Sequence, residues 1–274
     1  MKKILGIFLT LLLAVGVIPV MGLVANAETE GDFTYEVIGG EATVTRYTGS
    51  ASNVAIPASL GGYPVTVIGG RAFEYNKTIT SVTIPDGVRI IDQRAFLVCT
   101  KLAGIAIPGS VTSIGDAAFS DCESLARVTI PSGITSISMG AFHNCYSLAN
   151  VTIPSGVTSI GDSAFSGCRK FTAVNIPDSV ESIGSRAFYG IDALKSVTIP
   201  KSVTNIGDRA FGNAYNGNVI WNFKIRCYKG SAGQAYAEER GLAYDLIDGT
   251  GGDNFTRAFA NFFQMIANLF VSRW

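Results

Sequence analysis

Residues 148–168 read L-A-N-V-T-I-P-S-G-V-T-S-I-G-D-S-A-F-S-G-C, one copy of a unit that returns every 23 residues. A unit of this size cannot close its own core and buries its apolar side against the next unit, which is typical of a solenoid. We therefore predict a β-rich solenoid of seven repeats. The period is carried by Pro85, Pro108, Pro131, Pro154, Pro177 and Pro200, and by Phe73, Phe96, Phe119, Phe142, Phe165, Phe188 and Phe211.

Within the quoted unit, alternation of apolar and polar residues predicts a short strand. Val151 and Ile153 point inward and Thr152 outward, and Pro154 ends the strand because it has no N–H to donate. Stacking places each residue about 4.8 Å from its counterpart in the next coil. The expected core therefore consists of ladders of identical residues. Its other inward positions are Val157, Ile160, Ala164, Phe165 and Cys168.

These I-P, V-x-x-I-G, A-F and C landmarks, present from Val54 to Ala214, resemble the leucine-rich repeats of the BspA-like (Treponema-type) family of bacterial surface proteins. The first repeat departs by five extra residues around Leu60 to Tyr63. The resemblance implies an N-terminal β-hairpin cap, a C-terminal cap, and a non-catalytic binding or adhesion module for protein or glycan ligands. A structural scaffold or spacer, or a secreted effector acting on a host receptor, is the alternative.

The expected organisation follows from these landmarks and their flanks. It comprises a signal peptide (1–27), an N-terminal hairpin cap turning at Gly39-Gly40 (28–52), the leucine-rich repeat solenoid (53–215), a C-terminal cap (216–247), a Gly-rich linker (248–253) and a C-terminal amphipathic helix (254–274).

The first 27 residues have the pattern of a secretory signal. Lys2 and Lys3 precede an apolar run, and Ala25-Asn-Ala27 supplies the small residues that a signal peptidase reads. The predicted location is therefore secreted or on the extracellular face of the cell surface. An uncleaved membrane anchor is the alternative. With 21 basic and 21 acidic residues in the whole chain, no nucleic-acid partner is expected, since that requires a basic stripe.

Four cysteines, Cys99, Cys122, Cys145 and Cys168, fall at the repeat interval and are expected to stack in one column. Parallel Cα–Cβ vectors would hold their Cβ atoms about 4.8 Å apart, wider than the ~3.8 Å of a disulfide. We expect a reduced, buried ladder, with disulfides between coils as the alternative. A zinc site needs short paired spacings that this column lacks, and Cys227 is expected to be a packed thiol.

The sequence predicts no catalytic site, no metal site and no cofactor. The single histidine, His143, excludes an H-E-x-x-H helix. It is close to Cys145, but it occupies a variable column and is expected to be exposed. Asp92, Asp116, Asp162 and Asp208 recur near the Gly-Asp turn and are expected to act in turns rather than as calcium ligands.

The outward residues of the first strand of each repeat form the candidate ligand-binding surface. Threonine favours a half-exposed strand, so these positions can also be soluble filler. No aromatic residue occurs in these columns, which argues against sugar stacking there. The candidates are Thr83, Arg127, Thr129, Asn150, Thr152, Asn175 and Thr198.

The last segment of the chain has apolar residues at helical spacing. We expect this helix to lie in a membrane interface or to pair with another chain, with packing against the solenoid as the alternative. Its apolar stripe is Phe255, Phe259, Phe262, Ile266, Leu269, Phe270 and Trp274.

Overall fold

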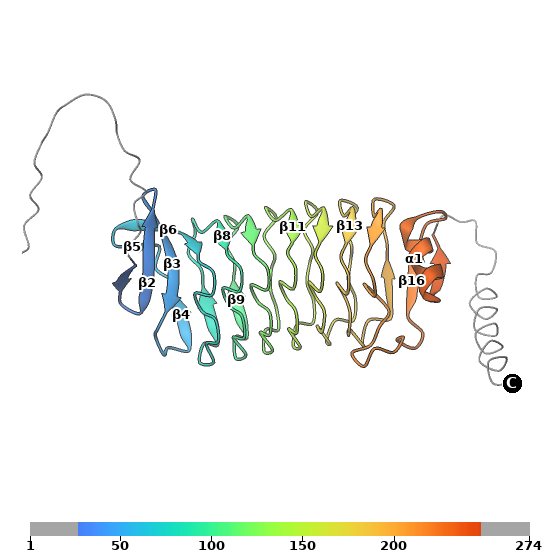
Figure 1. Ribbon diagram of the computed structural model, residues 1–274, viewed down its shortest axis with the longest axis horizontal. Coiled ribbons are helices and arrows are strands. Elements are labelled where there is room, and N and C mark those ends of the chain that lie inside the picture. The colour runs from blue at the N-terminus through green and yellow to red at the C-terminus, as the bar shows by residue number, and fades with distance from the viewer. Residues whose placement is uncertain (1–26, 248–274) are drawn as a thin grey trace, which may run out of the picture.

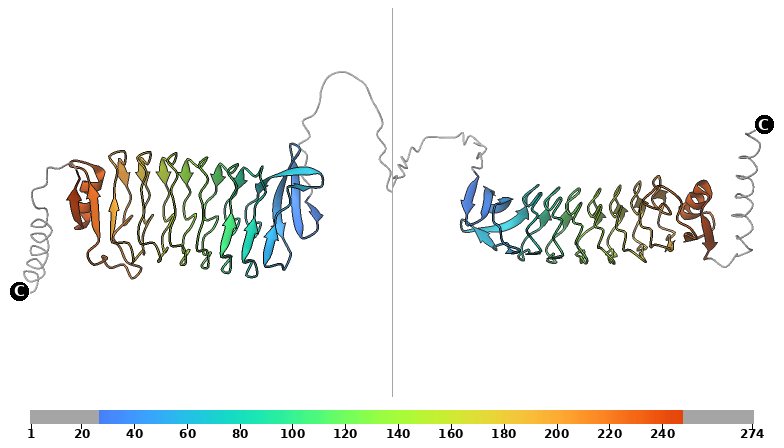
Figure 2. Two further views of the ribbon diagram at one scale, coloured as in Figure 1. Left: turned by 180° about the vertical axis from the view of Figure 1, so that it is seen from behind. Right: turned by 90° about the horizontal axis from the view of Figure 1, so that it is seen from below.

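The computed structural model describes residues 27–247, which form an elongated solenoid with β-strands at its N-terminal end and a helix at its C-terminal end (Figures 1 and 2). The predicted fold class is confirmed. The predicted signal peptide up to residue 26, the linker 248–253 and the amphipathic helix 254–274 lie outside the described residues.

The N-terminal end is an antiparallel hairpin joined to the first coil. β1 (Glu28–Glu30) pairs with β2 (Phe33–Ile38), which pairs with β3 (Glu41–Tyr47). The turn between β2 and β3 uses Gly39 and Gly40, whose positive φ values of 63° and 81° suit glycine. β3 then pairs in parallel with β6 (Tyr63–Ile68), and the extra residues of the first repeat form a small hairpin of β5 (Ser59–Leu60) with β6.

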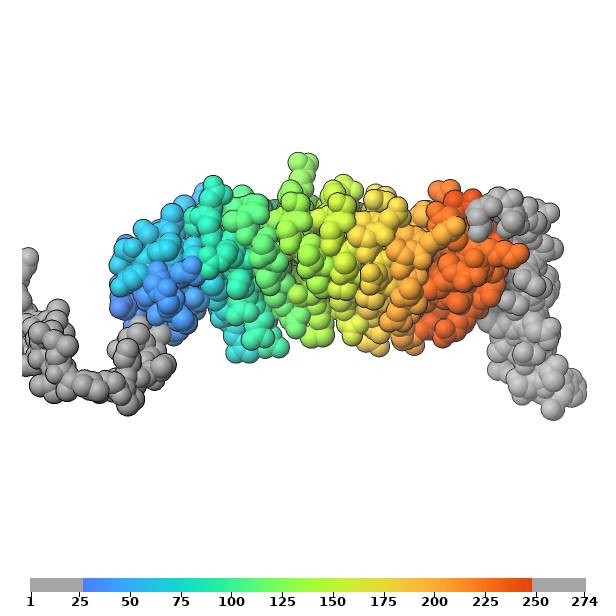
Figure 3. Space-filling view, turned by 90° about the horizontal axis from the view of Figure 1, so that it is seen from above, coloured from blue at the N-terminus to red at the C-terminus, as the bar shows by residue number. Residues whose placement is uncertain are grey.

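Each repeat contributes two short stretches of extended chain, most of which pair in parallel with the next repeat. The first stretch forms β4 (Asn53–Ala55), β7 (Ser81–Thr83), β9 (Gly104–Ala106) and β14 (Ser196–Thr198), with isolated bridges at Arg127, Asn150 and Asn175. The second stretch forms β8 (Ile90–Ile91), β10 (Ser113–Ile114), β11 (Ser136–Ile137), β12 (Ser159–Ile160), β13 (Ser182–Ile183) and β15 (Asn205–Ile206). Of these, β10 and β11 belong to separate sheets. Seen from above, the coils form a row of slanted ridges (Figure 3).

The Ala-Phe turns form a third side of the solenoid, which we call the turn face. Here the N–H of Phe142 donates to the carbonyl of Ala164 in the next coil (2.9 Å), whereas the N–H of His143 donates back to Gly140 (3.0 Å). The turn also requires a left-handed backbone at one position of the repeat, where Arg94 has φ 57° and Arg186 has φ 56°. The backbone of the turn face is hydrogen-bonded between coils without forming strands.

The predicted phenylalanine ladder runs through the whole core. Ring centroids of successive phenylalanines are 4.8 to 5.5 Å apart, and the rings are stacked. Tyr47 continues the ladder at the N-terminal end, 5.3 Å from Phe73. At the other end, Tyr236 meets Phe211 edge-on at 6.4 Å.

The four stacked cysteines are free and buried, as is Cys227. Each stacked thiol donates to the carbonyl of the phenylalanine 26 positions earlier, for example Cys145 Sγ to Phe119 O at 3.1 Å. Burial raises the pKa of Cys99 to about 12 and also raises the pKa values of Cys122, Cys145 and Cys168. The four thiols of this column are therefore uncharged at neutral pH and serve as buried packing groups.

We predict that the native protein reacts very slowly with a thiol reagent, because the thiolate is the reactive form and burial disfavours it. Titration with a chromogenic disulfide in denaturant, without reductant, should then release five equivalents, one for each cysteine of the chain. Because the folded pKa values are raised, the thiols' contribution to stability is full below about pH 8.5 and falls at higher pH. Fewer than two equivalents after denaturation would instead establish disulfides between coils.

The C-terminal cap consists of β16 (Lys224–Cys227), α1 (Ala232–Arg240) and β17 (Ala243–Leu246). β16 pairs in parallel with β14, and β17 with β16, so the cap extends the first-strand side by two strands. Ser231 caps the start of α1, and Gly241 ends it at φ 63°. The sequence predicts a cap here but does not indicate a helix within it.

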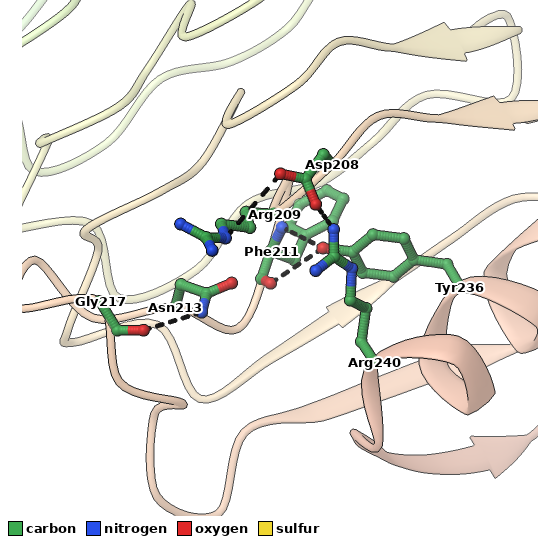
Figure 4. A network of polar contacts seen from close by, with 7 residues as sticks. All are labelled: Asp208, Arg209, Phe211, Asn213, Gly217, Tyr236 and Arg240. Carbon is green, nitrogen blue, oxygen red and sulfur yellow. Dashed lines mark hydrogen bonds and ion pairs between the residues drawn. The ribbon is translucent and has the colours of Figure 1, made fainter.

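α1 closes the open edge of the turn face. The hydroxyl of Tyr236 donates to the carbonyl of Phe211 (3.0 Å) and accepts its N–H (2.9 Å), as Figure 4 shows. In earlier coils the phenylalanine N–H donates to a carbonyl of the next coil, and the carbonyls of Phe73, Phe96, Phe119 and Phe142 accept the cysteine thiol of the next coil. The tyrosine therefore replaces the missing next repeat.

Candidate functional site

The structure places all seven predicted strand-face residues at exposed positions of the first-strand side. Thr83 belongs to β7 and Thr198 to β14, and Asn175 bridges to Thr198. Arg127 and Asn150 occupy the neighbouring column, joined to each other by a bridge. The structure thus brings the candidates onto one surface, here called the strand face. Their role in binding stays a prediction.

A shallow hollow of about 310 Å³ lies on the strand face, between β9 and the following coil. Small residues at Ala103, Gly104 and Ala126 leave the space, and Arg127 and Thr129 line its side. Here the ladder between coils is reduced to the single bridge of Gly104 with Arg127. The surface is otherwise made of short polar side chains, so it suits a broad contact better than enclosure of a small molecule.

His143 does not occupy the exposed position that the sequence predicts. It is half-buried, and its Nδ1 is buried with no hydrogen-bond partner in residues 27–247. Burial lowers the pKa of His143, and the nearby Asp121 opposes this shift. The imidazole is one of the groups that line a hollow on the turn face.

His143 and Cys145 do not form a nucleophile and base. The thiol of Cys145 points into the core, donates to the carbonyl of Phe119, and has a pKa raised well above its usual value by burial. A thiol nucleophile needs a lowered pKa and access to solvent. The pair is structural.

Two of the recurring aspartates have the predicted turn role. Asp116 Oδ1 accepts the N–H of Met139 (3.1 Å), and Asp162 Oδ1 accepts the N–H of Ser185 (2.7 Å). Each carboxylate therefore ties its turn to the next coil. Within the part of the chain that the structure describes, no group of three or more metal-ligating side chains converges.

The turn face has a hollow of its own, of about 330 Å³, which the sequence does not predict. The residues that line it come from four successive coils and from the loop that precedes the cap. The sequence carries a partial signal, because Tyr146, Arg169 and Tyr215 share one column and Ser163, Arg186 and Arg209 another. Spacing aligns these residues but does not show that they surround a hollow. The lining residues are His143, Asn144, Ser163, Ser166, Arg186, Tyr189, Arg209 and Tyr215.

The 23-residue period, the parallel pairing and the stacked ladders define a leucine-rich repeat solenoid. The family described as the BspA type leucine-rich repeat region matches residues 66–185 and 158–228, in six copies. The chain belongs to this family. No curated protein matches it.

Two solved structures show the same architecture. A leucine-rich cell surface protein from Faecalibacterium prausnitzii A2-165 is 28% identical over 73% of this chain and 76% of its own, with a TM-score of 0.50. The leucine-rich repeat protein of T. pallidum is also 28% identical, over 81% of this chain and 99% of its own, with a TM-score of 0.50. Within residues 27–247, no helix has the length and apolar character needed to cross a membrane.

Proposed function

We propose that this chain is an extracellular, non-catalytic recognition module of a bacterial surface protein, which binds a protein or glycan ligand across its strand face. Family membership and the likeness to a leucine-rich cell surface protein support the location. The observation that carries the binding role is the strand face itself, where Thr83, Arg127, Asn150 and Thr198 stand exposed on one continuous side.

The design of the solenoid supports recognition over catalysis. Most of its large apolar residues are buried in the ladders, and the Nδ1 of its one histidine has no hydrogen-bond partner within the described chain. What remains outward on the strand face is a set of hydroxyl and amide groups at the 23-residue interval, with Arg127 beside a shallow hollow. Such groups are able to form many weak hydrogen bonds at once, which suits a large ligand with a repeated or extended surface.

The test is a binding screen of the chain from residue 28 onward against an array of proteins and glycans, followed by two matched double variants. Thr129→Arg with Thr152→Arg blocks the strand face with two long cations. Thr135→Arg with Thr158→Arg makes the same change in the same coils, at exposed positions beside the second stretch of extended chain. We expect the first variant to weaken binding by about tenfold or more, and the second to leave it unchanged.

Equal loss in the two variants, or equal retention, would contradict recognition by the strand face. Absence of any ligand in the screen would favour a spacer or scaffold instead. Binding confined to a host receptor would favour a secreted effector.

A further inference from the structure

The turn-face hollow differs in chemistry from the rest of the solenoid surface. Its lining contains two arginines, Arg186 and Arg209, and two tyrosines, Tyr189 and Tyr215, but no aspartate or glutamate. Ser163, Ser166 and Asn144 add short polar groups. The whole chain carries equal numbers of basic and acidic residues, so this concentration of cationic groups is local. Its volume, about 330 Å³, is at the lower end for a small-ligand pocket.

The arginines of the hollow retain positive charge available to a ligand. Arg186 is exposed and forms no ion pair within residues 27–247. Arg209 lies 3.8 Å from Asp208, but that carboxylate is also held by Arg240 of α1 (Figure 4). One acid thus faces two arginines, and the group as a whole keeps a net positive charge.

Acidic residues near the hollow are occupied by other groups. Asp121 accepts hydrogen bonds from Asn144 Nδ2 (2.9 Å) and Ser120 Oγ (2.7 Å). Asp192 accepts the N–H of Tyr215 (3.0 Å). Asp162 accepts the N–H of Ser185. These carboxylates act in the scaffold that shapes the hollow and do not line it.

Tyr215 forms one wall of the hollow, and it comes from the loop that follows the last Ala-Phe turn, between Phe211 and β16. It is 51% exposed and packs on Gly190, where an added Cβ would lie 3.2 Å from its ring. The guanidinium of Arg169 lies 4.0 Å from the Tyr215 ring centroid and 4.6 Å from that of Tyr146. This cation–π stack holds the ring in place beside the hollow.

We propose that this hollow binds an acidic sugar residue of a larger glycan, with Arg186 and Arg209 on its carboxylate or sulfate and the rings of Tyr189 and Tyr215 against its C–H face. Arginine is suited to planar, bidentate recognition of such anions. The hydroxyl and amide groups of Ser163, Ser166 and Asn144 match the sugar hydroxyls. Its limited volume, about 330 Å³, favours a single sugar ring over an extended acidic peptide. This inference rests on the proposed recognition role but assigns a separate face.

The test measures binding of the chain from residue 28 onward to immobilised acidic glycans and their neutral counterparts at neutral pH. Oligogalacturonate is compared with its methyl ester, and dextran sulfate with dextran. Arg186→Ala is the main variant, and Arg94→Ala is its control, because Arg94 occupies the same column in a distant coil. Alanine is tolerated in this left-handed position, since Ala117 occupies it naturally at φ 53°.

We expect binding to one or both acidic glycans and not to their neutral counterparts, with the preferred acid identifying carboxylate or sulfate as the anion. Arg186→Ala should weaken binding by about tenfold or more, and Arg94→Ala should leave it within about twofold of the parent. Arg186→Lys should restore part of the loss, because it keeps the charge without the bidentate fork. Added salt should weaken binding of the parent more than that of Arg186→Ala.

Equal effects of Arg186→Ala and Arg94→Ala would overturn this site, as would equal binding to the acidic and neutral glycans. Tighter binding to poly-glutamate than to either acidic glycan would overturn the ligand class. Loss of glycan binding in Thr129→Arg/Thr152→Arg, but not in Arg186→Ala, would overturn the inference and leave the strand-face proposal standing. If the parent binds neither acidic glycan but binds another ligand in the screen, only the inference fails.

Discussion

Replacing Phe142 with alanine is expected to lower the free energy of unfolding by about 3 to 5 kcal/mol, the range for removing a buried aromatic ring. Phe142 is 0% exposed, and its ring centroid lies 5.5 Å from those of both Phe119 and Phe165. The coils on either side cannot move together to fill the space, because inter-coil hydrogen bonds hold their spacing. Urea unfolding followed by circular dichroism measures the change.

Met139→Ala is the matched control for this experiment. Met139 belongs to the same turn but is 54% exposed, so its loss should change stability by less than about 0.5 kcal/mol. If the Phe142 variant unfolds at the same urea concentration as the Met139 variant, the ladder does not contribute to stability as the geometry requires.

Ending the chain at Asn222 is expected to abolish cooperative unfolding or to lower the melting temperature more than Phe142→Ala does. This truncation removes β16, α1 and β17, and exposes the last coil along its whole cross-section, including Phe211 and Ile199, both buried in the intact chain. A chain ending at Ile247 is the control, since it keeps the cap. Thermal melts of the two chains should differ sharply, and coinciding melts would show that the cap is dispensable.

The hydroxyl oxygen of Tyr236 allows a more specific test of how the cap stabilises the last coil. Tyr236→Phe removes the hydroxyl that serves both the N–H and the carbonyl of Phe211, and leaves two buried backbone groups without partners. The expected loss of stability is about 1 to 3 kcal/mol. Tyr75→Phe, at a position 61% exposed, should have little effect. Equal stability of the two variants would mean that water replaces the hydroxyl.

Much of the architecture could be predicted from the sequence because a repeat of constant length leaves few choices. Because the repeat interval stays at 23 residues, parallel stacking places Phe142 on Phe165 and Ser136 beside Ser159. The register of the strands then follows without any knowledge of the turns. The hairpin at Gly39-Gly40 is also predictable from local chemistry, because glycine adopts the positive φ that this turn requires at little energetic cost.

The candidate surfaces were predictable only in part. The strand face follows from alternation, because a strand directs successive side chains to opposite sides. The turn face does not, because it is not a strand: residues at left-handed φ, such as Arg94 and Arg186, redirect the chain within each turn, so the two-residue rule for strands does not apply. His143 was therefore expected to be exposed and is half-buried.

The period, the ladders and the strand face are predictable from the sequence, since each depends on spacing alone. Where the period stops, only the packing of the folded chain sets the contacts. The loop after Phe211 folds back so that Tyr215 meets Arg169, two coils away along their column, and α1 turns so that Tyr236 completes the backbone pairing of the last coil. Spacing cannot place these residues, because their partners are set by packing in space across the end of the solenoid.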